Sequence, residues 1–255
     1  MDQLLALDSL YLGLEDENVQ ANIGGLSIFE GPPPPMSQLS GHAEAMLDSL
    51  PRFRQRILEL PPGLGRPLWV DHEDFELSEH LLETNLGRSV SLEALQDFYA
   101  DEMSKHLDRA KPLWKIQVVR GLPDGQWAIL WKVHHAMVDG IAASELMILL
   151  LSFEREPAVG AVTRWEPHAL PTTRHAAVAA FVGPAGPLKP FRDISRAARK
   201  PRRLADLALR TARNLVPVGV AAVTPNESPL NGPIGTERVW RTAELDLAKV
   251  KLAAT

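Results

Sequence analysis

One stretch constrains this chain more than any other, an apolar run that leads directly into two histidines, an acid and a glycine. Residues 127–133 read Trp-Ala-Ile-Leu-Trp-Lys-Val, and residues 134–140 read His-His-Ala-Met-Val-Asp-Gly. An apolar run with almost no polar interruption predicts a β-strand that is buried on both faces. Titratable side chains at the end of such a strand are typical of a functional site. We therefore expect chemistry at residues 134–140.

Several chemistries use histidine in such a cluster, and the rest of the sequence excludes most of them. The chain has no Gly-x-Ser-x-Gly turn for a serine nucleophile, no HExxH motif and no cysteine. Neighbouring side chains on a strand point to opposite faces, so His134 and His135 would diverge instead of binding one metal ion. What remains is a single neutral imidazole, with an ordinary pKa of about 6.5, that removes a proton from a bound alcohol, amine or thiol.

The acid and the glycine of this segment have a structural explanation that the two histidines lack. Asp139 is suited to cap a helix predicted from Ile141 to about Phe153, and Gly140 relieves the turn into that helix. A lone histidine at a strand end is usually structural. It is the pairing of His134 and His135 that favours a site.

Composition bounds the class of protein. The chain has 255 residues with 45% hydrophobic content, enough for a large core in one or two domains. A net charge of -5 gives no reason to expect nucleic acid, and the absence of cysteine excludes disulfides and thiolate metal sites. The N-terminus lacks the basic region of a secretory signal, and no segment is long and apolar enough to span a membrane. We expect a cytoplasmic protein that can lie on a membrane or lipid-inclusion surface.

The rest of the chain alternates predicted strands and helices. A strand from Trp114 to Arg120, a turn over 121–126 and the strand at 127–133 predict a hairpin. Ser91 caps a predicted helix over 91–107, and the inner stripe of that helix comprises Leu92, Leu95, Phe98, Tyr99 and Met103. Further strands are expected at 22–30, 68–71 and 239–245, with a helix at 40–50.

Two basic segments leave alternatives open. Arg52, Arg54 and Arg56 alternate along residues 51–57, which favours a solvated strand edge over phosphate contacts with coenzyme A. After a crossover rich in proline, glycine and alanine over 157–195, a basic helix is expected at about 194–215. That helix fits an anionic lipid surface, a solvated linker between domains, or the phosphates of coenzyme A.

The segment HHAMVDG resembles the HHxxxDG signature of CoA-dependent acyltransferases, the superfamily of chloramphenicol acetyltransferase and of peptide-synthetase condensation domains. Other stretches narrow the resemblance to the bacterial wax ester synthase/acyl-CoA:diacylglycerol acyltransferase family. These stretches are LDSLYLGLED, GGLSIFEGPPP, LPRFRQRI, LDRAKPLW and the loop PLNGPIGTER at 229–238. The resemblance covers the whole chain but only the N-terminal part of that family's longer chains, and the asparagine-aspartate pair that follows in the family is absent.

The resemblance implies a fold and a set of site residues. The fold would be α/β with a mixed sheet, of the chloramphenicol acetyltransferase type, with a first domain over 1–160, a linker and basic helix over 161–215, and an incomplete second domain over 216–255. In the family the second histidine is the general base, which implies that His135 is the base, that His134 shapes the site, and that Asp139 and Gly140 are structural. Supporting positions would be Pro112, Leu113, Trp114, Asn231, Gly232 and Arg238.

The resemblance also implies an activity. A fatty acyl group would pass from acyl-CoA directly to diacylglycerol or a long-chain alcohol, with no acyl-enzyme, no metal and no cofactor. The partners would be these substrates, a membrane or lipid-droplet surface, and the remaining C-terminal part of the same protein. Two alternatives stay open. One is a condensation-domain-like N-acyltransferase, against which the Pro-Leu-Trp and Pro-Leu-Asn-Gly-Pro-Ile-Gly stretches argue, and the other is a non-catalytic lipid-binding relative.

Overall fold

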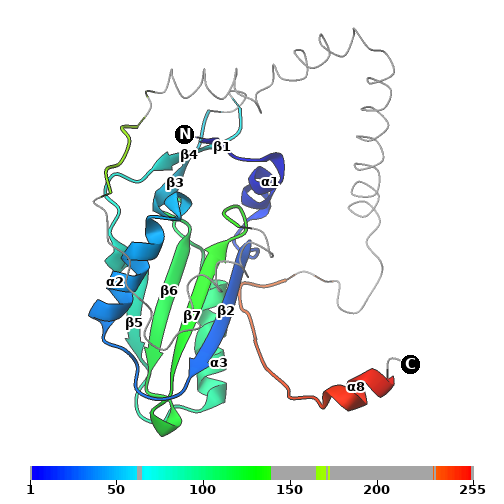
Figure 1. Ribbon diagram of the computed structural model, residues 1–255. Helices are drawn as coiled ribbons and strands as arrows, with labels where there is room; N and C mark the ends of the chain where they lie inside the picture. The colour runs from blue at the N-terminus through cyan, green and yellow to red at the C-terminus, as the bar shows by residue number, and fades with distance from the viewer. Residues whose placement is uncertain are drawn as a thin grey trace.

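A four-stranded mixed sheet forms the centre of the computed structural model, which describes residues 2–61, 65–138, 165–170, 172, 232 and 234–253. The strand order is β2 (Asn22–Phe29), β7 (Trp127–His134), β6 (Trp114–Arg120) and β5 (Leu81–Asn85) (Figure 1). β7 pairs antiparallel with both β2 and β6, whereas β5 pairs parallel with β6. The predicted hairpin and the mixed sheet are thus confirmed.

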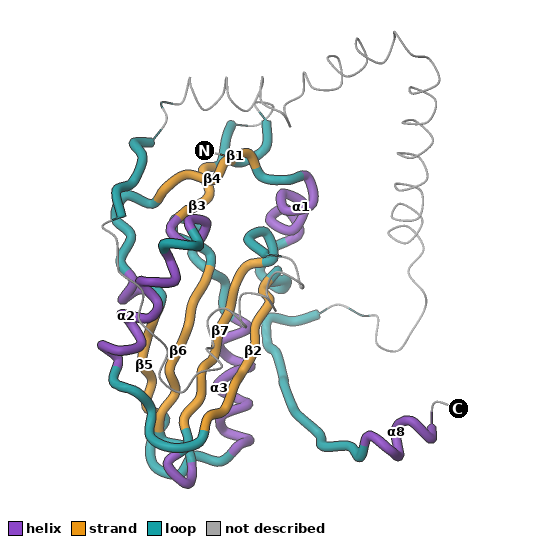
Figure 2. Tube along the Cα trace, viewed as in Figure 1, coloured by secondary structure: helices purple, strands orange, loops and turns teal. Residues whose placement is uncertain are grey.

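A second, three-stranded sheet lies beyond one end of the large sheet (Figure 2). Its order is β1 (Asp2–Gln3), β4 (Leu68–Asp71) and β3 (Gln55–Leu58), and both pairings are antiparallel. The helices are α1 (Ala6–Leu14), α2 (Met36–Leu47), α3 (Leu92–Ser104) and α8 (Leu247–Ala253). Short 3₁₀ helices occupy Pro51–Arg54, Leu77–Glu79 and Pro123–Gly125.

The strand β7 is buried on both faces, as its apolar sequence predicts. Ala128 and Leu130 pack against Leu95 and Tyr99 of α3. The alternate residues Ile129, Trp131 and Val133 belong to clusters that contain side chains of α2. Figure 1 shows α2 and α3 on opposite faces of the sheet. The central strand therefore needs no polar face, because a helix covers each side.

The helix α3 begins at its predicted cap. The Ser91 hydroxyl accepts a hydrogen bond from the backbone N–H of Ala94 at 3.2 Å. Leu95 is fully buried and Tyr99 is nearly so, but Leu92 is 52% exposed and lies outside the hydrophobic cluster. The predicted inner stripe is therefore wrong at Leu92, which is the first residue of the helix.

The arginine segment differs from the prediction in its burial. β3 does lie at a sheet edge, but residues 51–54 form a 3₁₀ helix before it. Arg54 is only 7% exposed and makes an ion pair with Asp48 at 3.0 Å, while the Arg52 guanidinium lies 4.7 Å from the ring centre of Trp69. The expectation of a solvated edge is wrong for Arg54, because its charge is paired inside the protein.

Residues 239–245 form no strand, contrary to the alternating pattern. Val239 and Leu245 are 81% and 77% exposed. Between them, Trp240 packs on Tyr99 with ring centres 4.8 Å apart, and the Gln96 side chain donates to the Thr242 hydroxyl at 2.7 Å. This segment therefore runs along α3 instead of joining a sheet.

Several predictions fall outside the described residues. They are the helix at 141–153, the basic helix at 194–215, most of the crossover, and the domain boundaries near 160 and 215. None of the helices in the described part of the chain has the length and apolar character needed to cross a membrane.

Candidate active site

The histidine pair lies where β7 ends and the chain turns. The backbone N–H of His134 donates to the carbonyl of Leu113 at 2.9 Å, and that of His135 donates to the carbonyl of Ala21 at 2.7 Å. The N–H of Met137 then donates to the carbonyl of His134 at 2.9 Å and closes a turn. His134 and His135 are therefore held by backbone hydrogen bonds to two different segments of the chain, and their side chains have different surroundings.

The ring of His134 is buried, with 1% of the residue exposed. Its Nδ1 accepts a hydrogen bond from the backbone N–H of Ala136 at 2.9 Å, so the neutral ring carries its proton on Nε2. Nε2 lies 3.2 Å from Oε1 of Glu15, so the N–H edge of the ring faces the carboxylate. The direction of approach does not make a hydrogen bond, and no other described residue supplies one.

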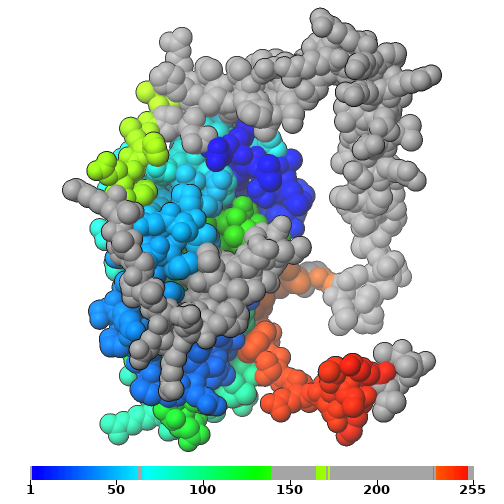
Figure 3. All heavy atoms as spheres, in the orientation of Figure 1, coloured from blue at the N-terminus to red at the C-terminus, as the bar shows by residue number. Residues whose placement is uncertain are grey.

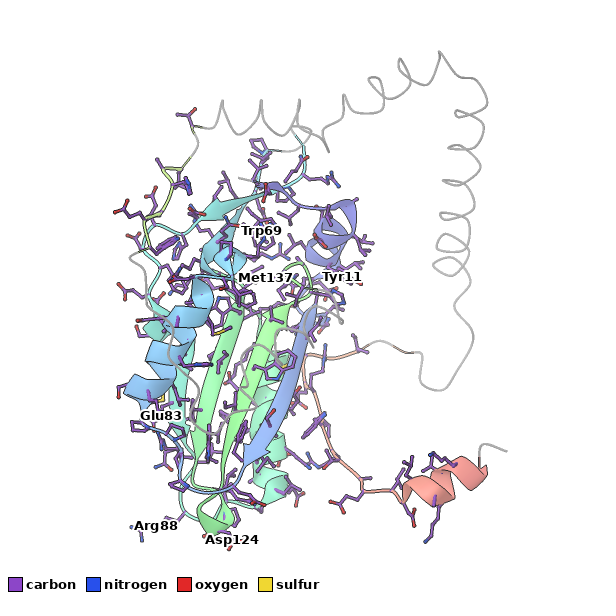
Figure 4. The ribbon with its side chains drawn as sticks, viewed as in Figure 1. Tyr11, Trp69, Glu83, Arg88, Asp124 and Met137 are labelled. Atoms are coloured by element: carbon purple, nitrogen blue, oxygen red, sulfur yellow. The ribbon has the colours of Figure 1, made fainter. Side chains whose placement is uncertain are left out.

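The ring of His135 is only partly buried. It stacks on the ring of Tyr11 from α1, with centres 3.8 Å apart and planes 17° from parallel. Figure 4 shows Tyr11 and Met137 at the same end of the large sheet. An imidazole that is held by its backbone, supported on one face and partly open is suited to accept a proton from a bound molecule.

Glu15 was not singled out by the sequence, although it lies within the LDSLYLGLED stretch. The Arg109 guanidinium donates to its Oε2 at 2.9 Å, and the backbone N–H of Ala21 donates to its Oε1 at 3.0 Å. Burial acts to raise the pKa of Glu15, but the contacts with His134, Arg109 and Ala21 outweigh it and lower the pKa to about 2. The side chain, only 5% exposed, is therefore a charged carboxylate at any working pH.

The Pro-Leu-Trp segment is buried next to the histidine pair and hydrogen-bonds to its backbone. Pro112, Leu113 and Trp114 are all buried, and Leu113 supplies the carbonyl that holds His134. The Trp114 indole donates to the carbonyl of Phe53 at 2.7 Å. Leu113 also shares a hydrophobic cluster with Leu12, Trp69 and Ala136, which joins α1 and the small sheet to the histidine turn.

Arg238 has a defined set of contacts. Its Nη2 donates to the carbonyl of Asn18 at 2.5 Å and to the Gln20 side chain at 2.7 Å, and its Nη1 donates to the carbonyl of Gly235 at 2.7 Å. This arginine therefore ties the loop at 234–238 to the segment that leads into Ala21, the backbone partner of His135.

The remaining predicted site residues are less informative. Gly232 is exposed, while Asp139, Gly140 and Asn231 lie outside the described residues. No group of three histidine, aspartate or glutamate side chains in the described residues is close enough together to hold a metal ion.

An apolar cavity lies between α2 and the large sheet. Its volume is about 30 Å³, and it is lined by residues that include Leu47, Phe53, Trp114, Trp131 and Val133. Figure 1 shows α2 on this face of the sheet, and in Figure 3 its atoms, in blue, lie at the surface of the molecule. A space of this size holds a water molecule or two, which is far too small for a long acyl chain.

The comparisons with known proteins agree with one another. The sequence profile of the wax ester synthase/diacylglycerol acyltransferase catalytic domain matches residues 4–255. A probable diacylglycerol O-acyltransferase of Mycobacterium tuberculosis H37Rv is 33% identical over 254 residues, which cover 98% of this chain and 52% of that protein. A second probable diacylglycerol O-acyltransferase of the same organism is 27% identical over 259 residues, covering 96% of this chain and 92% of that protein.

A solved structure is also similar. It is the wax ester synthase/diacylglycerol acyltransferase from Marinobacter aquaeolei VT8, with a TM-score of 0.51 and 29% identity over 63% of this chain and 41% of that one. The chain thus spans about half the length of the first curated relatives it matches. With the profile matched over nearly all of its residues, this chain belongs to the wax ester synthase/diacylglycerol acyltransferase family.

Proposed function

We propose that this chain carries the general base of an O-acyltransferase, which transfers a fatty acyl group from acyl-CoA to diacylglycerol, a long-chain alcohol, or both. The observation that carries the proposal is the His135 ring, which is partly open at the end of a buried strand and is held in place through Ala21 and Tyr11. The family assignment supplies the class of reaction, because the relatives are named for diacylglycerol acyl transfer.

In this mechanism the neutral His135 ring accepts the hydroxyl proton of the acceptor while the oxygen attacks the thioester carbonyl carbon. The carbon–sulfur bond of the tetrahedral intermediate then breaks, leaving the ester. The departing sulfur of coenzyme A accepts that proton from His135, so coenzyme A leaves as a thiol. Such proton transfer typically contributes about 10²–10⁴-fold to the rate, and much of the rest comes from holding both substrates in position. The step uses no metal and no cofactor.

Direct transfer is favoured over an acyl-enzyme. The chain has no cysteine. The described contacts of His135 are the stacked Tyr11 ring and the Ala21 carbonyl, which accepts from its backbone N–H, and neither is a hydrogen bond between the imidazole and a nucleophilic side chain. We therefore assign the proton abstraction to the acceptor hydroxyl itself. His134 shapes the site, and Asp139 and Gly140 remain structural candidates.

Part of the substrate-binding surface would lie outside the described residues. The small apolar cavity beside α2 cannot hold a long acyl chain. This chain matches about half the length of the first relatives. A C-terminal part, such as those relatives have, would complete the binding site. The present chain would support the binding site through six residues, Pro112, Leu113, Trp114, Asn231, Gly232 and Arg238.

A lipid surface is the proposed location of a cytoplasmic enzyme of this kind. Leu7, Leu10 and Leu14 are 58%, 50% and 54% exposed, and their spacing places them on one face of α1. The same helix carries Tyr11, which contacts His135. An apolar stripe beside the catalytic base would bring the site close to water-insoluble acceptors at a membrane or lipid inclusion.

The test is an assay of the full-length protein with acyl-CoA and either diacylglycerol or a fatty alcohol, following thiol release and separating the products. His135→Ala should reduce transfer by at least about 10²-fold because the base is lost, while the variant keeps the far-ultraviolet circular dichroism of the wild type. His134→Ala should reduce it less severely.

Two outcomes would contradict the proposal. Thiol release at the wild-type rate in His135→Ala would show that this ring is not the base. Wild-type protein that binds lipid but releases no thiol with any acceptor would support the non-catalytic alternative, whereas product formed only with an amine acceptor would support the N-acyltransferase.

A further inference from the structure

Within this proposed function, the geometry points to Glu15 as the positioning residue of the histidine pair. We infer that its carboxylate, anchored by Arg109, fixes the His134 ring in one tautomer and holds the backbone position of His135. Glu15 touches neither substrate nor reacting atoms in this arrangement, so its role is exerted through the two histidines.

The first link is the Glu15 carboxylate itself, which has a different partner on each oxygen. Oε2 accepts from Arg109 at 2.9 Å, and the same guanidinium nitrogen donates to the carbonyl of Leu12 at 2.6 Å, near the C-terminal end of α1. Oε1 accepts from the N–H of Ala21 at 3.0 Å and lies 3.2 Å from Nε2 of His134. A carboxylate with fixed partners on both oxygens has little freedom to rotate.

The second link runs from Glu15 to the His134 ring. The neutral ring carries its proton on Nε2, because Nδ1 accepts from the N–H of Ala136. The protonated edge of the ring therefore faces the charged oxygen. The opposite tautomer would bring a lone pair toward a carboxylate and a proton toward the N–H of Ala136, so both contacts would become repulsive. An ionised Glu15 and the N–H of Ala136 together favour a single tautomer at position 134.

The third link runs to His135 through the backbone. Ala21 donates its N–H to Glu15 and accepts the N–H of His135 at its carbonyl, at 2.7 Å. On the other side, Ala136 is held by the ring of His134. The Glu15 carboxylate therefore fixes Ala21, the backbone partner of His135, directly, and it fixes Ala136, the next residue in the chain, through His134. The buried acid thus acts on the catalytic imidazole only through His134 and the backbone, and not by direct contact as in a Ser-His-Asp triad.

The contact between Glu15 and His134 is buried, whereas the other carboxylate bound to Arg109, that of Glu59, is exposed. The side chains of Glu15 and His134 are 5% and 1% exposed. Arg109 also reaches Glu59 at 3.4 Å, but the Glu59 side chain is 65% exposed. Glu59 therefore provides a matched control, since it is a second carboxylate on the same guanidinium with no contact to either histidine among its described interactions.

The experiment compares Glu15→Gln with Glu59→Gln in the full-length protein. The Gln side chain preserves size but removes the charge, so it cannot serve Arg109 and His134 at once. We expect kcat of Glu15→Gln to fall about 10- to 100-fold, with KM for acyl-CoA within about twofold of wild type. Glu59→Gln should retain wild-type kcat. A loss in Glu15→Gln that resides entirely in KM would overturn the inference.

A second readout does not depend on activity. In protein labelled with ¹³C and ¹⁵N at histidine, the ring shifts of wild-type His134 should report a proton on Nε2. In Glu15→Gln the Nε2 resonance should move, because the charged oxygen that faces it is lost. The amide N–H of His135 should exchange with solvent faster in that variant. A proton on Nδ1 in the wild type would overturn the inference even if Glu15→Gln failed to fold, and so would unchanged ring shifts in a folded Glu15→Gln. Failure of acyl transfer in the wild type would instead remove the proposed function and leave these measurements interpretable.

Discussion

Lys132, two residues before the histidine pair, should make the stability of this protein rise with pH. The residue is only 3% exposed, and its ammonium donates to the carbonyls of Glu102 at 2.6 Å and Lys105 at 2.9 Å, at the C-terminal end of α3. Burial lowers the pKa of Lys132 from 10.5 to about 8, although the nearby Glu102 carboxylate opposes this shift. The unfolded chain therefore binds this proton more tightly than the folded chain does.

The sign and size of the effect follow from that difference. Below about pH 8 the lysine is charged in both states, and the folded state bears the full cost of burying the charge. As the pH rises from about 8 to 10.5, the folded state releases its proton first, so the free energy of unfolding increases. A pKa difference of about 2.5 pH units, at about 1.4 kcal/mol per unit, gives a gain of about 3 kcal/mol, most of it reached by pH 10.

The measurement is urea denaturation of the wild type and Lys132→Met from pH 7 to pH 10, followed by tryptophan fluorescence. Other groups titrate in this range, so the informative quantity is the wild-type stability minus that of the variant, which should rise with pH. Lys115→Met removes a partly buried positive charge that also pairs with Glu102, at 3.1 Å, and controls for the loss of a charge beside α3. A wild-type minus Lys132→Met difference that stays flat over the range would refute the reasoning.

Two further predictions concern packing and the lipid surface. Gly25→Ala would place a Cβ 2.5 Å from the indole nitrogen of Trp131 and should lower the free energy of unfolding by about 1–3 kcal/mol. Gly41→Ala, at a position in α2 with open space around it, should raise the free energy of unfolding by about 0.5–1 kcal/mol. Equal stabilities of the two variants in urea denaturation would contradict the packing argument. Leu10→Glu should weaken flotation of the protein with a triacylglycerol emulsion, whereas Leu92→Glu, at a residue of similar exposure on α3, should not. Equal flotation of both variants would remove α1 as the lipid contact.

The sequence by itself determined the features that depend on nearby residues. The apolar run at 127–133 predicts a strand covered on both faces, and α2 and α3 do cover it. Ser91 predicts the start of α3, since a cap acts on the next three residues only. The motif at 134–140 placed the candidate site at the strand end, and the wording of several stretches identified the family.

Only the tertiary structure decided what surrounds those residues. His134 and His135 are adjacent and identical in the sequence, yet one ring is buried against Glu15 and the other stacks on Tyr11 in a partly open position. Residues 239–245 alternate like a strand but pack on α3, because Trp240 meets Tyr99 there. Each of these outcomes depends on contacts between residues more than one hundred positions apart, and neither periodicity nor capping carries information over that separation.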